Sequence, residues 1–175
     1  LRRIYKILKD EKETCGIPVT SEDNKTYKEI KRAAAGELIK KQGLVSISGK
    51  KIISDFLETS GATGSRLVLP DEYTETDEGF MRIIENFRAE NSLYIFRKGL
   101  FNEIDAAAGK SPVLVATAPQ TVEWDGSLHG GCNPVIPFQD PLNVGAAVRS
   151  CAGFGIKRVI LTTDAAQPYH PTSIR

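Results

Sequence analysis

Three residues near the C-terminal end of the chain have types and a spacing that could support chemistry on an anion. Asn143, Gly145 and Arg149 lie within residues 133–162, which read NPVIPFQDPLNVGAAVRSCAGFGIKRVILT. The side-chain oxygen of an Asn near a helix start can accept a hydrogen bond from a backbone N–H that has no partner within the helix. A helix N-terminus also attracts negative charge. A guanidinium adds a planar fork of donors that fits a phosphate. The spacing therefore predicts an anion site, although a capping Asn and a solvated Arg explain it equally well.

The elements that must position these residues form a strand, a helix and a second strand. An apolar run over 135–138 predicts a strand that ends at an Asp-Pro turn. Small and apolar residues recur at intervals of three and four over 144–152, which predicts one helical face, and two glycines then end the helix. A β-branched run over 159–161 predicts the next strand. Such a β-α-β unit favours a parallel sheet.

This stretch resembles the first motif of the SpoU-type RNA 2′-O-ribose methyltransferases of the SPOUT superfamily. The resemblance is carried by Asp-Pro-x-Asn-x-Gly-x-x-x-Arg over 140–149 and by Gly-Phe-Gly over 153–155, followed by a hydrophobic strand. Residues 44–120 look like the small substrate-binding domain often fused in front of that catalytic domain. The run 169–175 is similar to the approach to the family's second motif, and the resemblance is strong only over 137–162.

The resemblance implies an α/β fold, with a small three-layer α/β substrate-binding domain followed by the first β-α-β part of a SPOUT (trefoil-knot) methyltransferase domain. We expect a basic helical N-terminal extension over 1–43, the RNA-binding domain over 44–118, a linker over 119–132 and the incomplete methyltransferase domain over 133–175. In the family, S-adenosylmethionine binds to a Gly-rich segment and a later Ser/Asn-rich segment, and neither precedes Arg175. We therefore expect the chain as given to bind no methyl donor and to have no turnover.

The same resemblance gives roles to individual residues. Arg149 takes the position of the catalytic Arg, Asn143 would orient Arg149 or the RNA backbone, and Gly145 would contact RNA. Because a guanidinium does not lose its proton in proteins, it is a poor base, so stabilisation of an alkoxide or phosphate is favoured over proton abstraction. The substrate domain resembles a fold that some ribosomal proteins use to bind kinked RNA. That likeness marks Ser48 and Lys50 as RNA contacts, with ordinary solvated residues as the alternative.

The composition limits the class of protein. Lys and Arg outnumber Asp and Glu by 13 to 7 over 1–51, and acidic residues outnumber basic ones by 11 to 6 over 52–120. The basic segment could follow phosphates or could be a solvated helical face. The three cysteines lack CxxC spacing, and the two histidines form no recognisable catalytic or metal-binding set. We expect a cytoplasmic protein without a metal or a membrane partner.

Two function classes stay open. The first is an S-adenosylmethionine-dependent RNA methyltransferase, which in complete form would be a homodimer. Its substrate would be rRNA rather than tRNA, since the separate substrate domain resembles that of large-subunit rRNA enzymes. The second is a non-catalytic RNA-binding module in which 44–120 binds RNA. A generic nucleotide-binding protein is disfavoured because the Gly-Lys-Ser of 109–111 lacks the upstream glycine and the following helix of a phosphate loop.

Apolar periodicity and turn residues predict the other elements along the chain. We expect a helix over 1–12, a linker over 14–25 and a helix over 26–42. Alternating elements should follow, with strands over 44–47, 67–69, 93–96 and 113–116 and helices over 49–57, 80–87 and 100–107. Repeated β-α units of this kind predict a three-layer domain with a mainly parallel sheet.

Overall fold

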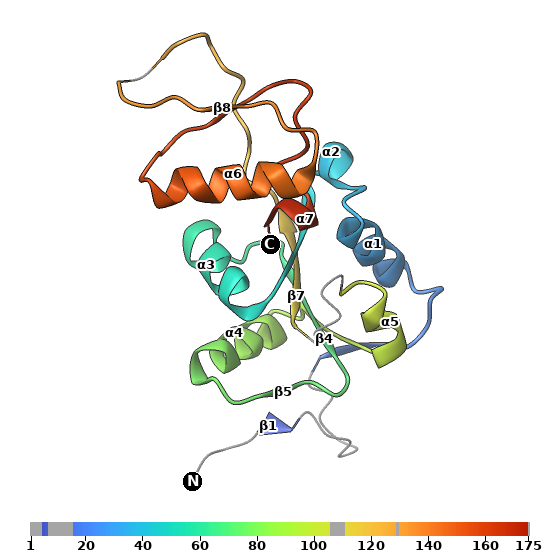
Figure 1. Ribbon diagram of the computed structural model, residues 1–175. Coiled ribbons are helices and arrows are strands. Elements are labelled where there is room, and N and C mark those ends of the chain that lie inside the picture. The colour runs from blue at the N-terminus through green and yellow to red at the C-terminus, as the bar shows by residue number, and fades with distance from the viewer. Residues whose placement is uncertain (1–4, 7–15, 106–110, 129, 175) are drawn as a thin grey trace. The chain divides into compact units, whose positions relative to one another are not determined.

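The chain divides into two compact units, Leu1–Thr117 and Ala118–Arg175 (Figure 1). The computed structural model describes residues 5–6, 16–105, 111–128 and 130–174. Within these ranges no helix is both long enough and apolar enough to cross a membrane.

The first unit is built on a five-stranded sheet of order β2-β6-β4-β7-β3. Its strands are β2 (Ile17–Val19), β3 (Leu44–Ser48), β4 (Arg66–Pro70), β6 (Leu93–Phe96) and β7 (Val113–Thr117). β2 and β4 both pair parallel with β6, whereas β7 pairs antiparallel with β4 and with β3. Four strands therefore point in one direction, and their carboxyl ends meet at one edge of the sheet, here named the carboxyl edge.

Helices cover both faces of this sheet. α1 (Lys25–Ala34) and α5 (Lys98–Asn102) lie on one side, and α3 (Lys50–Ser60) and α4 (Glu78–Ala89) lie on the other (Figure 1). On the α1 side, Tyr27 packs against Phe96 with 5.7 Å between ring centroids, in a cluster that also contains Phe101. Ile53 and Phe87 are buried on the opposite helices. The predicted three-layer α/β domain with a mainly parallel sheet is confirmed, and β7 is the strand that runs the other way.

The N-terminal segment differs from the predicted helical extension. Of the helix expected over 1–12, the structure describes only β1 (Tyr5–Lys6), which pairs antiparallel with β5 (Thr74–Glu75). The linker expected over 14–25 contains β2, an edge strand of the main sheet. Pro18 is tolerated there because an edge strand does not need every backbone N–H for its ladder. The sequence did not indicate this strand, because it is only three residues long and because its proline and the neighbouring polar residues are typical of a turn.

The continuous helix expected over 26–42 is instead two helices, α1 and α2 (Ile39–Gln42). The break contains Gly36, whose φ of 76° lies in the left-handed region that favours glycine. The N–H of Glu37 donates to the carbonyl of Arg32 at 3.0 Å, which is one of the bonds of a Schellman motif. The glycine therefore ends α1 early. The sequence prediction overlooked Gly36 because it follows a run of alanines that favours a helix.

The second unit contains one β-α-β unit and a short final helix. Its elements are β8 (Val135–Ile136), α6 (Pro141–Gly153), β9 (Ile160–Leu161) and α7 (Pro171–Ile174). β8 and β9 are parallel, with Ile136 opposite Leu161. The predicted strand, helix and strand of this stretch are therefore confirmed.

Candidate functional site

The start of α6 is set by Asp140 rather than by Asn143. The Asp140 carboxylate accepts a hydrogen bond from the N–H of Leu142 at 2.9 Å, and Pro141 occupies the first helical position. Asn143 is thus the third residue of the helix and is exposed: it lies near the helix start, as expected, but Asp140 is the residue that caps it. Residues six apart do not face each other on a helix. Accordingly, no hydrogen bond joins Asn143 to Arg149 among the described residues.

Gly145 and Arg149 are four residues apart and share the face of α6 that packs against α7. Gly145 is buried, and a Cβ added there would lie 2.1 Å from the backbone oxygen of Ser173. No side chain fits at that distance, so the glycine permits the close approach of α7. Gly145 was predicted to contact RNA, and in this arrangement such a contact would require α7 to move away.

Arg149 is held by a backbone carbonyl. Its Nη1 donates to the oxygen of Ser173 at 2.9 Å, which uses one of the five N–H groups of a guanidinium. The residue is otherwise exposed, and none of the ion pairs between described residues involves it. A protonated guanidinium with one fixed nitrogen and no carboxylate partner is able to bind a phosphate or stabilise a developing alkoxide.

Ser173 also ties α7 to the start of α6. Its buried hydroxyl lies 2.8 Å from the carbonyl oxygen of Pro141 and 3.1 Å from that of Gln167. Close by, Nδ1 of His170 accepts a hydrogen bond from the N–H of Thr172 at 3.2 Å, so this nitrogen serves the local turn. No group of three His, Cys, Asp or Glu side chains in the described ranges could hold a metal ion.

The predicted RNA contacts of the first unit lie at its carboxyl edge. Ser48 ends β3, and Lys50 begins α3. Lys50 is not simply solvated, because its Nζ lies 3.0 Å from Oε1 of Glu75. The Lys50 side chain is 47% exposed, whereas that of Glu75 is only 4% exposed. Part of the Lys50 charge is therefore compensated by Glu75, a partner that no local pattern in the sequence indicated.

Glu75 is a buried carboxylate that accepts hydrogen bonds from several donors. It accepts hydrogen bonds from the hydroxyl of Tyr73 at 2.5 Å and from the backbone N–H groups of Thr76 and Asp77 at 2.8 and 2.9 Å. Burial by itself raises the pKa of Glu75, but these donors and Lys50 outweigh it and lower the pKa below its ordinary value. Burial and the bond to Glu75 raise the pKa of Tyr73, so its hydroxyl stays protonated. This network fixes the loop that follows β4.

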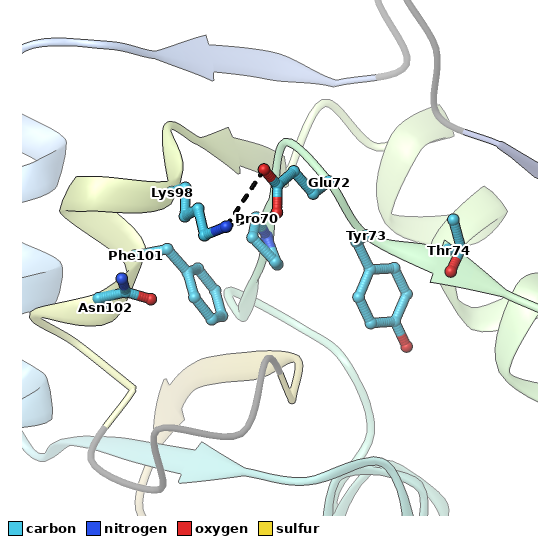
Figure 2. A pocket seen from close by; sticks show the side chains of 7 residues that line it. All are labelled: Pro70, Glu72, Tyr73, Thr74, Lys98, Phe101 and Asn102. Carbon is cyan, nitrogen blue, oxygen red and sulfur yellow. Dashed lines mark hydrogen bonds and ion pairs between the residues drawn. The ribbon is translucent and has the colours of Figure 1, made fainter.

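A small pocket lies beside this loop (Figure 2). Its volume is about 190 Å³, and Lys98 bridges to Glu72 at 2.9 Å at its rim. The lining residues are Pro70, Glu72, Tyr73, Thr74, Lys98, Phe101 and Asn102. Sites for drug-sized ligands usually measure about 300–1,000 Å³, so we assign no ligand to this pocket.

Comparison with known proteins supports the fold. No family model matches the chain. Over 159 residues, the chain is 30% identical to Ribosomal RNA small subunit methyltransferase G 2 of Syntrophobacter fumaroxidans, across 90% of this chain and 30% of that protein. The crystal structure of an rRNA methyltransferase from Sinorhizobium meliloti has a TM-score of 0.70 at 16% identity, over 90% of this chain and 59% of that one.

The SpoU methyltransferase AviRb of Streptomyces viridochromogenes, solved in complex with the cofactor AdoMet, has a TM-score of 0.63 at 17% identity, over 86% of this chain and 57% of that one. The chain thus spans less than two thirds of the length of each of these three proteins. At identities this low, the TM-scores show a shared fold and no more. The predicted fold class is therefore confirmed: this chain has the α/β fold found in RNA methyltransferases, including one of the SpoU type.

Proposed function

We propose that this chain is part of an RNA 2′-O-ribose methyltransferase of the SpoU type, with rRNA as its substrate and S-adenosylmethionine as its cofactor. One observation carries the proposal: Arg149, in the motif that resembles this family, is fixed on α6 by a neutral acceptor and keeps its remaining donors exposed. The fold shared with rRNA methyltransferases supports it. The sequence relative is named as a methyltransferase of small-subunit rRNA, which supports rRNA as the substrate but not the SpoU type or the 2′-O position.

The proposed role of Arg149 follows from the chemistry of a ribose hydroxyl. A 2′-OH is a poor nucleophile, and negative charge develops on its oxygen as the proton leaves. A fixed positive group beside that oxygen, or beside the adjacent phosphate, lowers the energy of this charge. A guanidinium does not lose its proton in proteins, so Arg149 would act as a donor and not as the base. The methyl group itself would come from the sulfonium of S-adenosylmethionine.

We assign no cofactor contact to the described residues. In parallel α/β sheets, ligands bind beyond the carboxyl ends of the strands, and in the second unit Thr162 follows β9 at such an end. Its Oγ1 is buried and has no hydrogen-bond partner among the described residues. One hydroxyl does not make a site for an adenosyl group, so the described residues do not fit the cofactor. The proposal that this chain alone is inactive rests on the same reasoning.

Substitution of Arg149 tests the catalytic proposal. In the full gene product, Arg149→Ala should lower methyl transfer about 10²–10³-fold, as expected when a donor to a developing oxyanion is lost. The matched control is Arg158→Ala, which removes an exposed Arg from the loop between α6 and β9. Methyl incorporation and circular dichroism would be measured together. Unchanged activity of a folded Arg149→Ala variant would contradict the role of Arg149.

A separate experiment would identify the RNA: ribose methylation sites would be mapped in a strain that lacks the gene and compared with those of the parent strain.

The second candidate is a non-catalytic RNA-binding module. It is favoured by the contrast between the closed three-layer first unit and the single β-α-β unit of the second. In both readings Ser48 and Lys50 would contact RNA at the carboxyl edge. Calorimetry with S-adenosylmethionine on the full gene product separates them: micromolar binding would favour the enzyme, and no binding would favour the RNA-binding module. Micromolar binding by this chain alone would contradict its proposed inactivity. Light scattering on the full gene product would test the proposed homodimer.

A further inference from the structure

We infer that Gly145 and Ser173 are positioning residues for Arg149, and that together they aim the guanidinium without reducing its charge. This inference deepens the proposed function and rests on it. The three residues come from two helices, since Gly145 and Arg149 belong to α6 and Ser173 belongs to α7. Each residue supplies a different part of the arrangement.

Gly145 supplies the space. A Cβ at this position would lie 2.1 Å from the oxygen and 2.8 Å from the carbonyl carbon of Ser173, and both are backbone atoms. A flexible side chain could move aside, but a backbone carbonyl moves only if α7 moves. Any other residue at 145 would therefore push α7 outward. The oxygen of Ser173 would then move beyond hydrogen-bond distance of Arg149.

A glycine at position 145 lowers the stability of α6, so a structural requirement should explain its presence. Glycine inside a helix is less favourable than alanine by about 1 kcal/mol. The neighbouring small positions of α6, residues 146, 147 and 152, are all alanine, so small size alone is not what position 145 requires. Only contact with the backbone of α7 demands the complete absence of a side chain.

Ser173 supplies the acceptor and its anchor. Its carbonyl oxygen receives Nη1 of Arg149 at 2.9 Å, while its hydroxyl lies 2.8 Å from the carbonyl oxygen of Pro141 in the first turn of α6. The acceptor for Arg149 is thus tied back to the helix that carries Arg149. Such a closed connection fixes the direction of the guanidinium relative to α6.

The nature of the acceptor matters for the charge. A carboxylate partner would both orient and compensate the guanidinium, as Glu75 does for Lys50 in the first unit. A carbonyl is neutral, so it orients Arg149 and leaves the full positive charge available to an RNA oxygen or phosphate. Arg149 is therefore aimed but not neutralised, which is the condition that electrostatic stabilisation requires.

Gly145→Ala in the full gene product tests the inference, with Gly153→Ala as its matched control. Gly153 ends the same helix, and a Cβ there would meet no atom within 4 Å. We expect Gly145→Ala to lower kcat about 10²-fold, because a shift of roughly 1 Å misplaces the guanidinium, while KM changes little. Gly153→Ala should leave both constants unchanged. A folded Gly145→Ala enzyme with wild-type kcat would overturn the inference.

A second readout does not depend on turnover. In this chain labelled with ¹⁵N-arginine, the Nη–H signal of Arg149 should exchange slowly with water, and it should lose that protection in Gly145→Ala but keep it in Gly153→Ala. Fast exchange in the unsubstituted chain would overturn the inference, even if Arg149→Ala abolishes activity and so supports the proposed function. Conversely, protection together with full activity of Arg149→Ala would remove the proposed function and leave a purely structural bond.

Ser173→Ala provides the test if Gly145→Ala does not fold. This variant keeps the space and the carbonyl but removes the hydroxyl that lies beside Pro141 and Gln167. We expect a loss of about tenfold in kcat, smaller than for a displaced α7, together with faster exchange of the Arg149 signal. Wild-type kcat with unchanged exchange would contradict the positioning role of Ser173.

Discussion

The two units differ in how completely they bury their apolar side chains. Of the buried apolar residues that the structure describes, 24 belong to the first unit and only two, Ile136 and Val144, belong to the second. Seven of the eight large apolar side chains found exposed lie in the second unit, and Phe154 is 85% exposed. The first unit thus has a sheet covered on both faces, whereas the second has two paired strands and open apolar surface.

This difference shows which part of the chain is structurally self-sufficient. A sheet of two strands is marginal in water, and exposed apolar patches with free strand edges usually have a partner. We expect the second unit to gain stability from further contacts that cover this surface. The proposed catalytic Arg149 lies in this weaker unit, so its local support by Gly145 and Ser173 matters all the more.

The largest expected effect compares one aromatic residue from each unit. Phe96→Ala removes a fully buried ring that packs on Tyr27 and should cost about 3–5 kcal/mol of unfolding free energy. Phe154→Ala removes an exposed ring and should change it by less than about 0.5 kcal/mol. Urea unfolding followed by circular dichroism measures both. Equal losses would mean that Phe154 is buried in solution and that the contrast between the units is wrong.

A smaller effect concerns the buried carboxylate of the first unit. Glu75→Gln should cost about 2 kcal/mol at neutral pH, because a charged acceptor of several hydrogen bonds is lost. The folded pKa of Glu75 is lowered, so the stabilisation from its charge is complete above its ordinary pKa of 4.5 and is lost as the pH falls through the folded value. The variant should therefore show a flatter decline in stability below about pH 4.5.

The matched control is Glu58→Gln, which changes an exposed carboxylate on α3. Its unfolding free energy should stay within about 0.5 kcal/mol of the unsubstituted chain at neutral pH. If Glu75→Gln and the unsubstituted chain lose stability in parallel from pH 7 to pH 3, the donors around Glu75, Tyr73 first among them, do not hold its charge in solution.

The smallest effect compares the helix caps of the two units. The side chain of Asn24 accepts from the N–H groups of Thr26 and Tyr27, and Asp140 caps α6 in the same manner. Each substitution to Ala should cost about 1 kcal/mol of helix stability. The Asn24→Ala loss should appear in global unfolding, since α1 packs on the main core. For Asp140→Ala we expect faster hydrogen exchange confined to α6, and a global loss of the same size would show that the units unfold together.

Local sequence signals located most elements because periodicity reports which side chains are buried. The predicted strand over 93–96 coincides with β6, and the other buried strands were predicted to within two residues at each end. The predicted helix over 100–107 is shorter, since α5 ends at Asn102, and residues 106–107 lie outside the described residues. β2 was missed because an edge strand of three residues carries too little periodicity to separate it from a turn.

The sequence by itself determined the strands and helices of the main sheet from β3 to β7, the β-α-β unit around α6 and the choice of Arg149 as the residue to test. Only the tertiary structure decided the reversed direction of β7 and the partners of the charged groups. Lys50 meets Glu75 25 residues later, and Arg149 meets Ser173 24 residues later. Periodicity encodes the face that an element buries, but it does not encode the distant backbone or side chain that lies opposite that face.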